Sequence, residues 1–192
     1  MKLVFATHNL GKLKEVQEIT GNRFQLLSLA DIGFAEDIPE PWPTLEENAL
    51  EKARTIYRRF GLNCFAEDTG LEVEALNGEP GVLTARYAGE HKSPDDNINL
   101  VLQKLQNAAN RRARFRTVFA LVLNGNEYLF EGIASGTITL QRQGEGGFGY
   151  DPVFLPHGYA QTFAQLPAEV KNQISHRGKA MQQLIQFLRQ LE

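Results

Sequence analysis

Two adjacent acidic residues, Glu67 and Asp68, lie between an apolar run at residues 64–66 and the small residues Thr69 and Gly70. Neighbouring carboxylates repel each other, so they are tolerated in solvent or useful around a cation. Magnesium binds carboxylate and phosphate oxygens and keeps several waters. Because successive side chains of an extended segment point in opposite directions, we expect only one of the pair to face a site. Considered alone, the segment is equally typical of a solvated acidic turn at the end of a strand.

The polar loop near the N-terminus has the composition of a phosphate site. Thr7, Asn9 and Lys12 follow a β-prone run at residues 2–6 and precede apolar residues at helical spacing. A hydroxyl and an amide can orient phosphate oxygens, a lysine supplies charge, and the start of a helix favours anions. An ordinary helix cap followed by an exposed lysine is the alternative interpretation.

Two later segments add candidate ligand contacts. The glycine-rich loop at residues 144–149 contains the spacing of a dinucleotide fingerprint, but it follows a polar stretch and precedes a proline, so that interpretation fails in context. Its glycines instead allow backbone to approach a ligand closely, and the neighbouring aromatic residues offer a stacking face. Near the C-terminus, Lys171, His176 and Arg177 supply hydrogen-bond donors.

The elements that must position these residues predict an α/β protein with a mixed sheet. Strands are expected at residues 2–6, 24–29, 64–66, 71–75, 114–123 and 127–140, and helices after Lys12, at 44–60, from Ser93 and from Ser175. The pair Thr44 and Glu47 has the spacing of a capping box, and Asn124-Gly125 is a strong hairpin signal. Because no repeat or Gly/Ser linker interrupts residues 1–192, we expect a single domain.

Composition narrows the range of partners. The net charge is −3, and the one dense basic stretch, Arg111–Arg116, alternates with apolar residues, so we expect a solvated edge or a partner contact there, and no nucleic-acid binding. No apolar run approaches the roughly 20 residues of a membrane helix, so no membrane partner is expected. The single cysteine, Cys64, lies in an apolar run, which favours buried packing over a nucleophilic role and fits a reducing cytoplasm.

Six motifs, in order along the chain, resemble the Ham1/RdgB-like inosine triphosphate pyrophosphatase family, the non-canonical purine NTP pyrophosphatases. They are TxNxxK from Thr7, Ile38-Pro39-Glu40, FAEDTGLEVEALNGEPG from Phe65, TARYAG from Thr84, GGFGYDPVF from Gly146 and KNQISHRGKA from Lys171. The resemblance implies an elongated mixed β-sheet flanked by helices, with two lobes around a central nucleotide cleft (ITPase/Maf-like). It also implies a cytoplasmic homodimer that uses Mg²⁺ to hydrolyse ITP, dITP and XTP to the monophosphate and pyrophosphate, cleansing the nucleotide pool of deaminated purines.

The resemblance further implies roles for individual residues. Asp68 is similar to the catalytic carboxylate that activates water and binds metal, and Glu40 and Glu67 are the other metal candidates. The expected substrate-binding residues are Thr7, His8, Asn9, Leu10, Gly11, Lys12 and Thr69 for the triphosphate, Phe148, Gly149, Tyr150 and Asp151 for the base and sugar, and Lys171, His176 and Arg177 for the purine. A donor-rich pocket favours the C6 keto oxygen of hypoxanthine or xanthine over the amino group of adenine, but it does not explain how GTP is excluded.

Two other nucleotide-binding functions are compatible with parts of this pattern. Maf-like NTP pyrophosphatases share the architecture, although the final SHRGKA segment argues against them. A nucleotide-binding or regulatory module without turnover is the alternative from another class. The joint presence of Glu40, Asp68 and Lys12 weighs against such a module.

Overall fold

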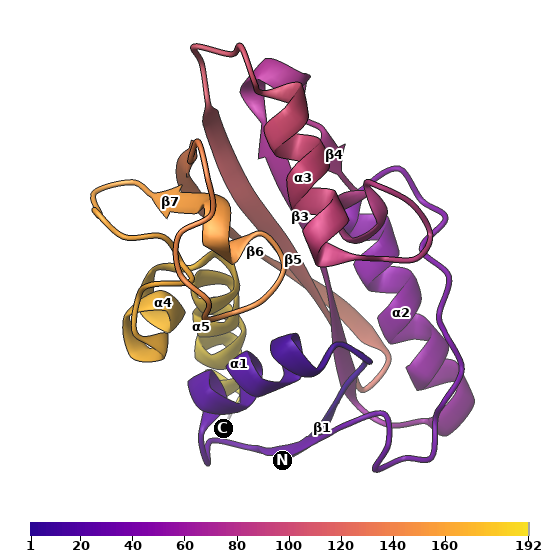
Figure 1. The fold of residues 1–192 in the computed structure, drawn as a ribbon. Coiled ribbons are helices and arrows are strands. Elements are labelled where there is room, and N and C mark those ends of the chain that lie inside the picture. The colour runs from indigo at the N-terminus through magenta and orange to yellow at the C-terminus, as the bar shows by residue number, and fades with distance from the viewer. Residues whose placement is uncertain (192) are drawn as a thin grey trace. The chain divides into compact units, whose positions relative to one another are not determined.

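A mixed β-sheet is the framework of the protein in the computed structural model, which describes residues 1–191 (Figure 1). Its strands are β1 (Lys2–Phe5), β2 (Gln25–Leu27), β3 (Cys64–Val73), β4 (Pro80–Gly81), β5 (Arg112–Leu123), β6 (Asn126–Ile138) and β7 (Phe154–Pro156). The helices are α1 (Leu10–Thr20), α2 (Leu45–Phe60), α3 (Pro94–Lys104), α4 (Ala168–Ile174) and α5 (His176–Arg189). The strand order is β2-β1-β3-β5-β6-β7, and β4 pairs with β3 outside this path. The predicted α/β class with a mixed sheet is confirmed.

The parallel part of the sheet brings the first polar loop to the acidic segment. β1 pairs in parallel with both β2 and β3, which requires the crossover helices α1 and α2 between these strands. In the register with β3, Phe5 lies opposite Phe65, and the backbone N–H of Ala6 donates to the Phe65 carbonyl over 2.8 Å. Both strands therefore run in the same direction from the paired residues, toward Thr7 just after β1 and toward Glu67 within β3.

Contacts divide the chain into two compact units, each with its own core. The first unit comprises residues 1–68, 117–132 and 177–192, and the second comprises residues 69–116 and 133–176. Strands β3, β5 and β6 therefore contribute residues to both units. The expectation that residues 1–192 form a single domain therefore stays a prediction.

The core of the first unit is built from the buried faces of β1, β3, β5, α1 and α5. Phe5 stacks on Phe65 with ring centroids 4.7 Å apart, and Phe119 contacts both rings. The apolar stripe expected for the last helix packs against them through Ala180, Met181, Leu184, Ile185 and Leu188. This packing fixes α1, β3 and α5 relative to one another, which matters because each carries charged residues described below.

The core of the second unit gathers apolar residues from α3, β5, β6 and β7. Its centre is the aromatic cluster of Phe115, Phe154 and Phe163, with ring centroids 4.7–6.1 Å apart. Ile98, Val101 and Leu105 from α3 complete it. The cluster supports the segments that carry Asp151 and Lys171.

The acidic segment is part of a strand, so the prediction that it forms a turn at a strand end is wrong. β3 continues without interruption from Cys64 to Val73, and both Glu67 and Asp68 are buried. Backbone pairing with neighbouring strands keeps the segment extended, a contribution that the residues alone do not reveal. The carboxylates are thus interior groups that require compensating charge.

Two other elements differ in extent from the expectation. The second strand is only Gln25–Leu27, shorter than the predicted 24–29. The helix α4 was not predicted, because it is short and begins directly after Pro167 without a side-chain cap. The hairpin signal is confirmed, since Asn124 and Gly125 form the two-residue turn between β5 and β6 with φ of 51° and 83°. Such turns require positive φ at both positions, which asparagine and glycine tolerate best.

Over the described part of the chain, none of the helices is both long enough and apolar enough to cross a membrane.

The start of α2 gives a test of the local fold. The Thr44 hydroxyl accepts from the Glu47 backbone N–H over 3.2 Å and donates to the Glu47 carboxylate over 2.7 Å. We expect Thr44→Ala to lower the free energy of unfolding by about 1 kcal/mol, because one helix N–H loses its cap. Equilibrium urea denaturation measures the change. Thr44→Ser keeps the hydroxyl and serves as the control, so equal losses in both variants would contradict the capping role.

Candidate functional site

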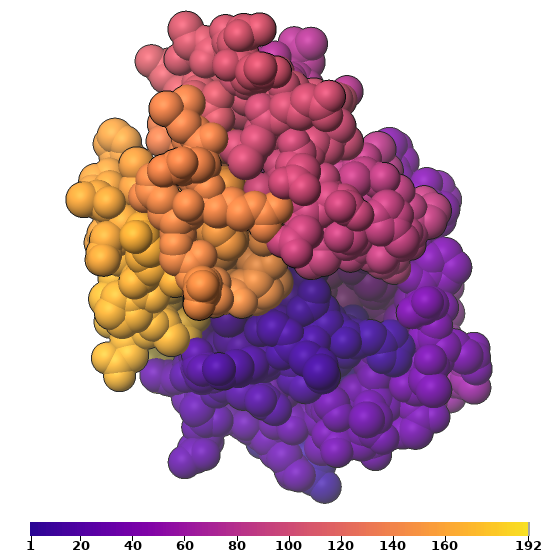
Figure 2. Space-filling view, in the orientation of Figure 1, coloured from indigo at the N-terminus to yellow at the C-terminus, as the bar shows by residue number. Residues whose placement is uncertain are grey.

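The first polar loop forms the N-terminus of α1. Asn9 is the N-cap, and its Oδ1 accepts from the Lys12 backbone N–H over 3.0 Å, while the Thr7 hydroxyl oxygen accepts from the Asn9 N–H over 3.1 Å. The backbone N–H groups of Leu10 and Gly11 have no carbonyl four residues earlier within the helix, so they point out of its positive end. Residues 7–12 are half-buried or exposed, and the N-terminal part of the chain, in indigo, is visible at the surface in Figure 2. The cap interpretation and the anion-site interpretation are therefore both compatible with the loop.

Glu67 is held by two cations. Its carboxylate accepts two hydrogen bonds from the Arg177 guanidinium, over 2.8 Å from Nε and 2.9 Å from Nη2. The Lys12 Nζ lies 2.8 Å from Oε1 of the same carboxylate. Burial by itself raises the pKa of Glu67, but the Arg177 and Lys12 charges outweigh burial and hold the pKa of this carboxyl well below its usual range. Glu67 is thus an ionised, fixed acceptor.

Asp68 has a different set of partners, as expected for successive residues of a strand. Its Oδ1 lies 3.5 Å from the Nζ of Lys52, and the same ammonium lies 2.5 Å from Oε1 of Glu40. The Thr117 hydroxyl donates to the Asp68 backbone carbonyl over 3.1 Å. The other carboxylate oxygen, Oδ2, is buried and has no hydrogen-bond partner among residues 1–191.

The charges around Asp68 are not fully balanced. Burial is the largest influence on this carboxyl and raises its pKa; the Lys52 ammonium opposes burial, and the negative charge of Glu40 adds to it. Burial lowers the pKa of Lys52, but Asp68 and Glu40 outweigh it, so that pKa is raised. One lysine, Lys52, therefore pairs with two carboxylates, those of Asp68 and Glu40. These two carboxylates can accommodate an additional positive charge.

The residues present fit a magnesium ion, although no three His, Cys, Asp or Glu side chains cluster as ligands within the described residues. The fit rests on Asp68 Oδ2, a buried anionic oxygen without a partner in that part of the chain, and on Glu40, which converges on the same lysine. Magnesium is commonly held by one or two carboxylates together with substrate phosphates and water. Both Glu67 oxygens already contact cations, and its metal role stays a prediction.

Asn48 fixes the proline-rich loop that carries Glu40. Its Oδ1 accepts from the Trp42 backbone N–H, and its Nδ2 donates to the Trp42 carbonyl, each over 3.0 Å. Asn48 itself is buried on α2. This paired hydrogen bond attaches an irregular loop to a helix and so limits where Glu40 can lie.

A second cluster of buried polar residues lies in the second unit. The Lys171 ammonium donates to Oδ2 of Asp151 over 2.5 Å and lies 5.0 Å from the centre of the Phe148 ring. The Phe148 backbone N–H donates to the same Asp151 oxygen over 2.9 Å. The buried imidazole of His176 stacks on Phe115 with centroids 4.6 Å apart and planes 16° from parallel. The cluster combines a cation, an imidazole and an aromatic face.

The glycines of the glycine-rich loop at residues 144–149 leave space for other atoms of the protein. A Cβ on Gly147 would lie 2.0 Å from Oδ2 of Asp151, and one on Gly146 would lie 2.6 Å from the Ala164 carbonyl oxygen. Gly147 also has a φ of 69°, which glycine adopts without strain. In the structure the closest approach at Gly147 is to the Asp151 carboxylate, and the approach to a ligand stays a prediction.

The remaining predicted site residues occupy varied environments. Gly149 has a positive φ, Thr69 is half-buried on β3, and Tyr150 is buried with its hydroxyl donating to the Thr84 carbonyl over 2.6 Å. His8 is exposed, with Nε2 2.9 Å from the Glu36 carbonyl oxygen. Their roles toward a substrate stay predictions.

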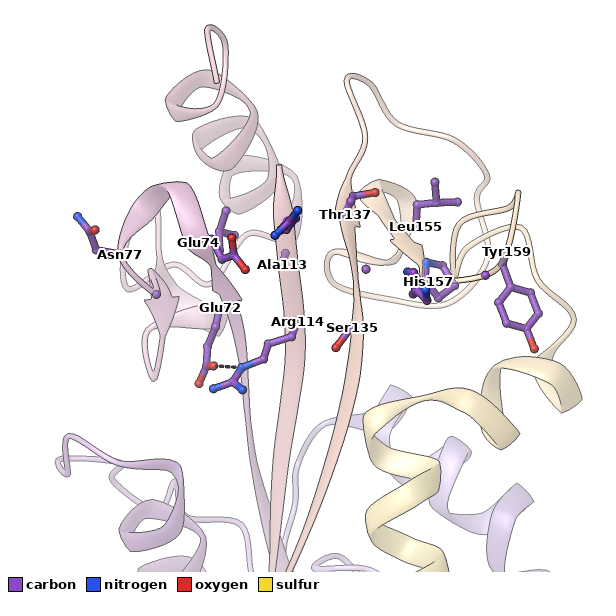
Figure 3. A pocket seen from close by; sticks show the side chains of 16 residues that line it. Glu72, Glu74, Asn77, Ala113, Arg114, Ser135, Thr137, Leu155, His157 and Tyr159 are labelled. Carbon is purple, nitrogen blue, oxygen red and sulfur yellow. Dashed lines mark hydrogen bonds and ion pairs between the residues drawn. The ribbon is translucent and has the colours of Figure 1, made fainter. Parts of the chain in front are cut away.

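A hollow in the second unit is separate from these residues (Figure 3). Its volume is about 670 Å³, and it is lined by residues of β3, β5 and β6, by Glu74, Asn77 and Gly78, and by residues 155–159. None of the predicted site residues lines it. The ion pair within it, between Glu72 and Arg114 at 2.6 Å, is solvent-accessible. The hollow therefore lies away from the buried charges described above.

Sequence reasoning missed Lys52, Asn48 and Glu15. The buried stripe of α2 is Leu45, Asn48, Ala49, Lys52, Ala53 and Ile56. A lysine and an asparagine four residues apart on an otherwise apolar stripe are a usable signal, because such groups are buried only with partners. Glu15, buried beside Val16 on α1, gives the same signal more weakly.

Two other interpretations from the sequence can be compared with the structure. Cys64 is buried, its thiol donates to the Ala53 carbonyl, and burial raises its pKa to about 12, so the prediction of a packing role is confirmed. In the basic stretch, Arg111 donates to the carbonyls of residues 105, 138 and 139, and Arg114 pairs with Glu72. These arginines have contacts within the chain.

The fold and the first-unit cluster define a class: an α/β protein with buried carboxylates and lysines beside a helix N-terminus. The comparison with protein families matches residues 3–187 to the Ham1 family. The chain belongs to this family, and the predicted family is thus confirmed.

Relatives and solved structures agree with this membership. The chain is 54% identical to the dITP/XTP pyrophosphatase of Flavobacterium johnsoniae over 188 residues, covering 98% of each chain. It is 50% identical to that of Porphyromonas gingivalis, covering 97% of each. Among solved structures, the Ham1 proteins of Staphylococcus aureus and Coxiella burnetii both superpose with a TM-score of 0.90. They are 39% and 36% identical, and the matches cover 100% and 99% of each chain.

The packing at Gly147 gives a test of the second cluster. We expect Gly147→Ala to destabilise the protein by roughly 2 kcal/mol more than Gly158→Ala, measured by urea denaturation. Both positions have positive φ, so both alanines add backbone strain, but a Cβ at Gly158 meets nothing within 4 Å. The difference isolates the clash with Asp151. Equal destabilisation of the two variants would show that the close approach does not matter.

Proposed function

We propose that this chain hydrolyses the non-canonical purine nucleoside triphosphates ITP, dITP and XTP to the monophosphate and pyrophosphate, removing deaminated purines from the nucleotide pool. The class of enzyme, a hydrolase of acid anhydrides, follows from the family and from relatives named dITP/XTP pyrophosphatase. One observation carries the proposal for this chain. Asp68 presents a buried carboxylate oxygen that no group within residues 1–191 satisfies, directly after the residue that holds Lys12 at the start of α1.

The start of α1 is the proposed triphosphate grip. Lys12 offers an ammonium, and the N–H groups of Leu10 and Gly11 point out of the positive end of an eleven-residue helix. The side chains of Thr7 and Asn9 add polar groups in the same loop. Together these groups suit the charge and the oxygen geometry of a triphosphate better than they suit a neutral ligand.

Asp68 is the proposed catalytic carboxylate. Lys52 lies near Oδ1, and the carboxylate as a whole is proposed to accept a proton from a water molecule. The activated water would attack the α-phosphorus, and the bond to the bridging oxygen would break to release pyrophosphate. Thr117 anchors the Asp68 backbone and so limits the movement of this carboxylate.

Asp68 and Glu40 are the residues proposed to hold Mg²⁺. The ion, when bound, supplies positive charge that offsets the charge developing on the phosphate oxygens. Lys52 orients both carboxylates through its contacts of 3.5 Å and 2.5 Å. Asn48 helps indirectly by fixing the loop that carries Glu40.

The cluster of the second unit is the proposed site for the base. Lys171 and His176 provide donors suited to a C6 keto oxygen, and Phe148 provides an aromatic face. An amino group at C6, as in adenine, would face donors, and each unpaired buried donor costs about 1–3 kcal/mol. Guanine shares the keto group, so its exclusion requires contacts near C2 for which no residue is assigned.

A homodimer and a cytoplasmic location remain predictions from the family resemblance.

A panel of nucleotides tests the proposed substrate class. With Mg²⁺, we expect purified protein to release pyrophosphate from ITP, dITP and XTP at least about tenfold faster than from ATP, as one or more mismatched donors imply. Pyrophosphate is measured by a coupled phosphate assay. Equal turnover of the normal triphosphates would refute the selectivity, and binding of ITP without any turnover would favour a binding module.

The role of Asp68 is tested by Asp68→Asn, which removes the proton acceptor and keeps the side-chain shape. We expect pyrophosphate release to fall at least about 100-fold, the range of general-base catalysis. ITP binding, measured by calorimetry, should stay within about tenfold. Glu72→Gln makes the same chemical change on an outward-facing residue of β3 and should retain activity. Unchanged activity in the Asp68 variant would disprove the assigned role.

A further inference from the structure

The hydroxyl of Thr84 joins two neighbouring strands of the second unit. Thr84 begins a short 3-10 helix, Thr84–Arg86. Its Oγ1 accepts a hydrogen bond from the Leu71 backbone N–H over 2.8 Å and donates one to the Gly81 carbonyl over 2.6 Å. Leu71 of β3 and Gly81 of β4 are paired in the register of these antiparallel strands. The hydroxyl therefore connects the two partners of one pair.

The backbone around this hydroxyl is closely packed. A Cβ on Gly70 would lie 3.0 Å from the Gly81 carbonyl oxygen, the same atom that accepts from Thr84. Leu71 is completely buried, and a buried backbone N–H is almost always hydrogen-bonded. Without the Thr84 hydroxyl, the Leu71 N–H would lose the partner that it has here. The hydroxyl thus fixes β3 directly after Thr69 and Gly70.

The backbone carbonyl of Thr84 holds a second segment. The Tyr150 hydroxyl donates to this carbonyl over 2.6 Å, and Tyr150 is buried. Burial raises the pKa of the Tyr150 hydroxyl well above its usual range, so the hydroxyl stays a proton donor at neutral pH. Tyr150 precedes Asp151, whose carboxylate accepts from Lys171 and from the Phe148 N–H. A shift of Thr84 would therefore reach the residues proposed to surround the base.

Asn97 gives the Thr84 segment a firm support. Its side chain is buried on α3, and its Nδ2 donates to the Ala85 carbonyl over 3.0 Å and lies 3.5 Å from the Thr84 carbonyl oxygen. Its Oδ1 accepts from the Ala88 N–H over 2.7 Å. Because α3 packs into the core of the second unit, these contacts attach the Thr84 segment to that core.

We propose that Thr84 is a positioning residue that fixes two parts of the substrate site at once, the triphosphate side through β3 and the base side through Tyr150. The proposal rests on the proposed function, which assigns Thr69 to the triphosphate and residues 148–151 to the base and sugar. Loss of the Tyr150 hydroxyl frees only the base side, whereas loss of the Thr84 hydroxyl frees both. Such alignment matters because a misplacement of about 1 Å can cost about 100-fold in rate.

The two halves of the substrate test this role separately. Inorganic tripolyphosphate reports on the triphosphate side and inosine monophosphate on the base side, and calorimetry in Mg²⁺ buffer measures the Kd of each. Thr84→Val keeps the side-chain shape without the hydroxyl, so we expect both affinities to fall about tenfold, the effect of one hydrogen bond. Thr84→Ser keeps the hydroxyl and should retain both affinities within about twofold.

Tyr150→Phe separates the two contacts of Thr84. It removes the hydrogen bond to the Thr84 carbonyl and leaves the contacts of the Thr84 hydroxyl with β3 and β4 intact. We expect inosine monophosphate to bind about tenfold more weakly and tripolyphosphate to stay within about twofold. An equal loss for tripolyphosphate would overturn the division between the two sides.

Matched controls exclude general effects of these substitutions. Thr137→Val and Tyr159→Phe make the same chemical changes at exposed positions of the second unit and should alter neither affinity. Partial unfolding lowers the binding stoichiometry, whereas misplacement raises the Kd of the folded molecules. In Thr84→Val, unchanged Kd values or a loss confined to one ligand would overturn the proposal. Thr84→Ala carries the test, with the same two losses expected, if the valine variant does not fold.

Binding of the two probes does not depend on turnover. A wild type that binds both probes but releases no pyrophosphate from ITP refutes the proposed function alone. A wild type that hydrolyses ITP and whose two affinities survive Thr84→Val refutes the positioning role alone. A wild type that binds neither probe also overturns the positioning role, and its pyrophosphate release is measured independently.

Discussion

The burial of two adjacent carboxylates inside β3 is the constraint on which the rest of the site depends. A strand sends Glu67 and Asp68 in opposite directions, and each buried charge needs its own partner. Glu67 receives Arg177 and Lys12, and Asp68 receives Lys52, which it shares with Glu40. Each partner arrives on a different element, so helices α1, α2 and α5 are all tied to one strand by charge. Removing Lys52 would leave the buried Asp68 carboxylate without its ion-pair partner.

The two carboxylates differ because their surroundings differ. Glu67 contacts two cations, Arg177 and Lys12, whose charges outweigh burial and lower its pKa. Asp68 is undercompensated, with one shared lysine and one oxygen that lacks a partner among residues 1–191. The first arrangement suits a structural acceptor, and the second suits a group that receives a proton or binds a cation. Residues of similar chemistry, next to each other in the chain, thereby have different electrostatic environments.

Gly147 and Asn48 position neighbouring residues, and such residues are easily mistaken for ligand contacts. Gly147 leaves space for the Asp151 carboxylate. The Asn48 side-chain amide forms two hydrogen bonds with the Trp42 backbone, one through its oxygen and one through its nitrogen. In each case the residue acts by placing a charged neighbour. Part of the buried polar chemistry of this protein therefore positions other side chains of the protein.

The sequence by itself determined the elements that depend on local rules and the residue types that carry chemistry. The hairpin at Asn124-Gly125, the cap at Thr44 and the six ordered motifs are local patterns, because turns and caps need particular residues at particular spacings. Only the tertiary structure decided which charges meet. Glu15 and Arg177 are 162 residues apart, and no periodic pattern links them. The acidic segment became a buried strand through pairing with its neighbours, since the free energy of such a segment depends on partners that a single sequence does not locate.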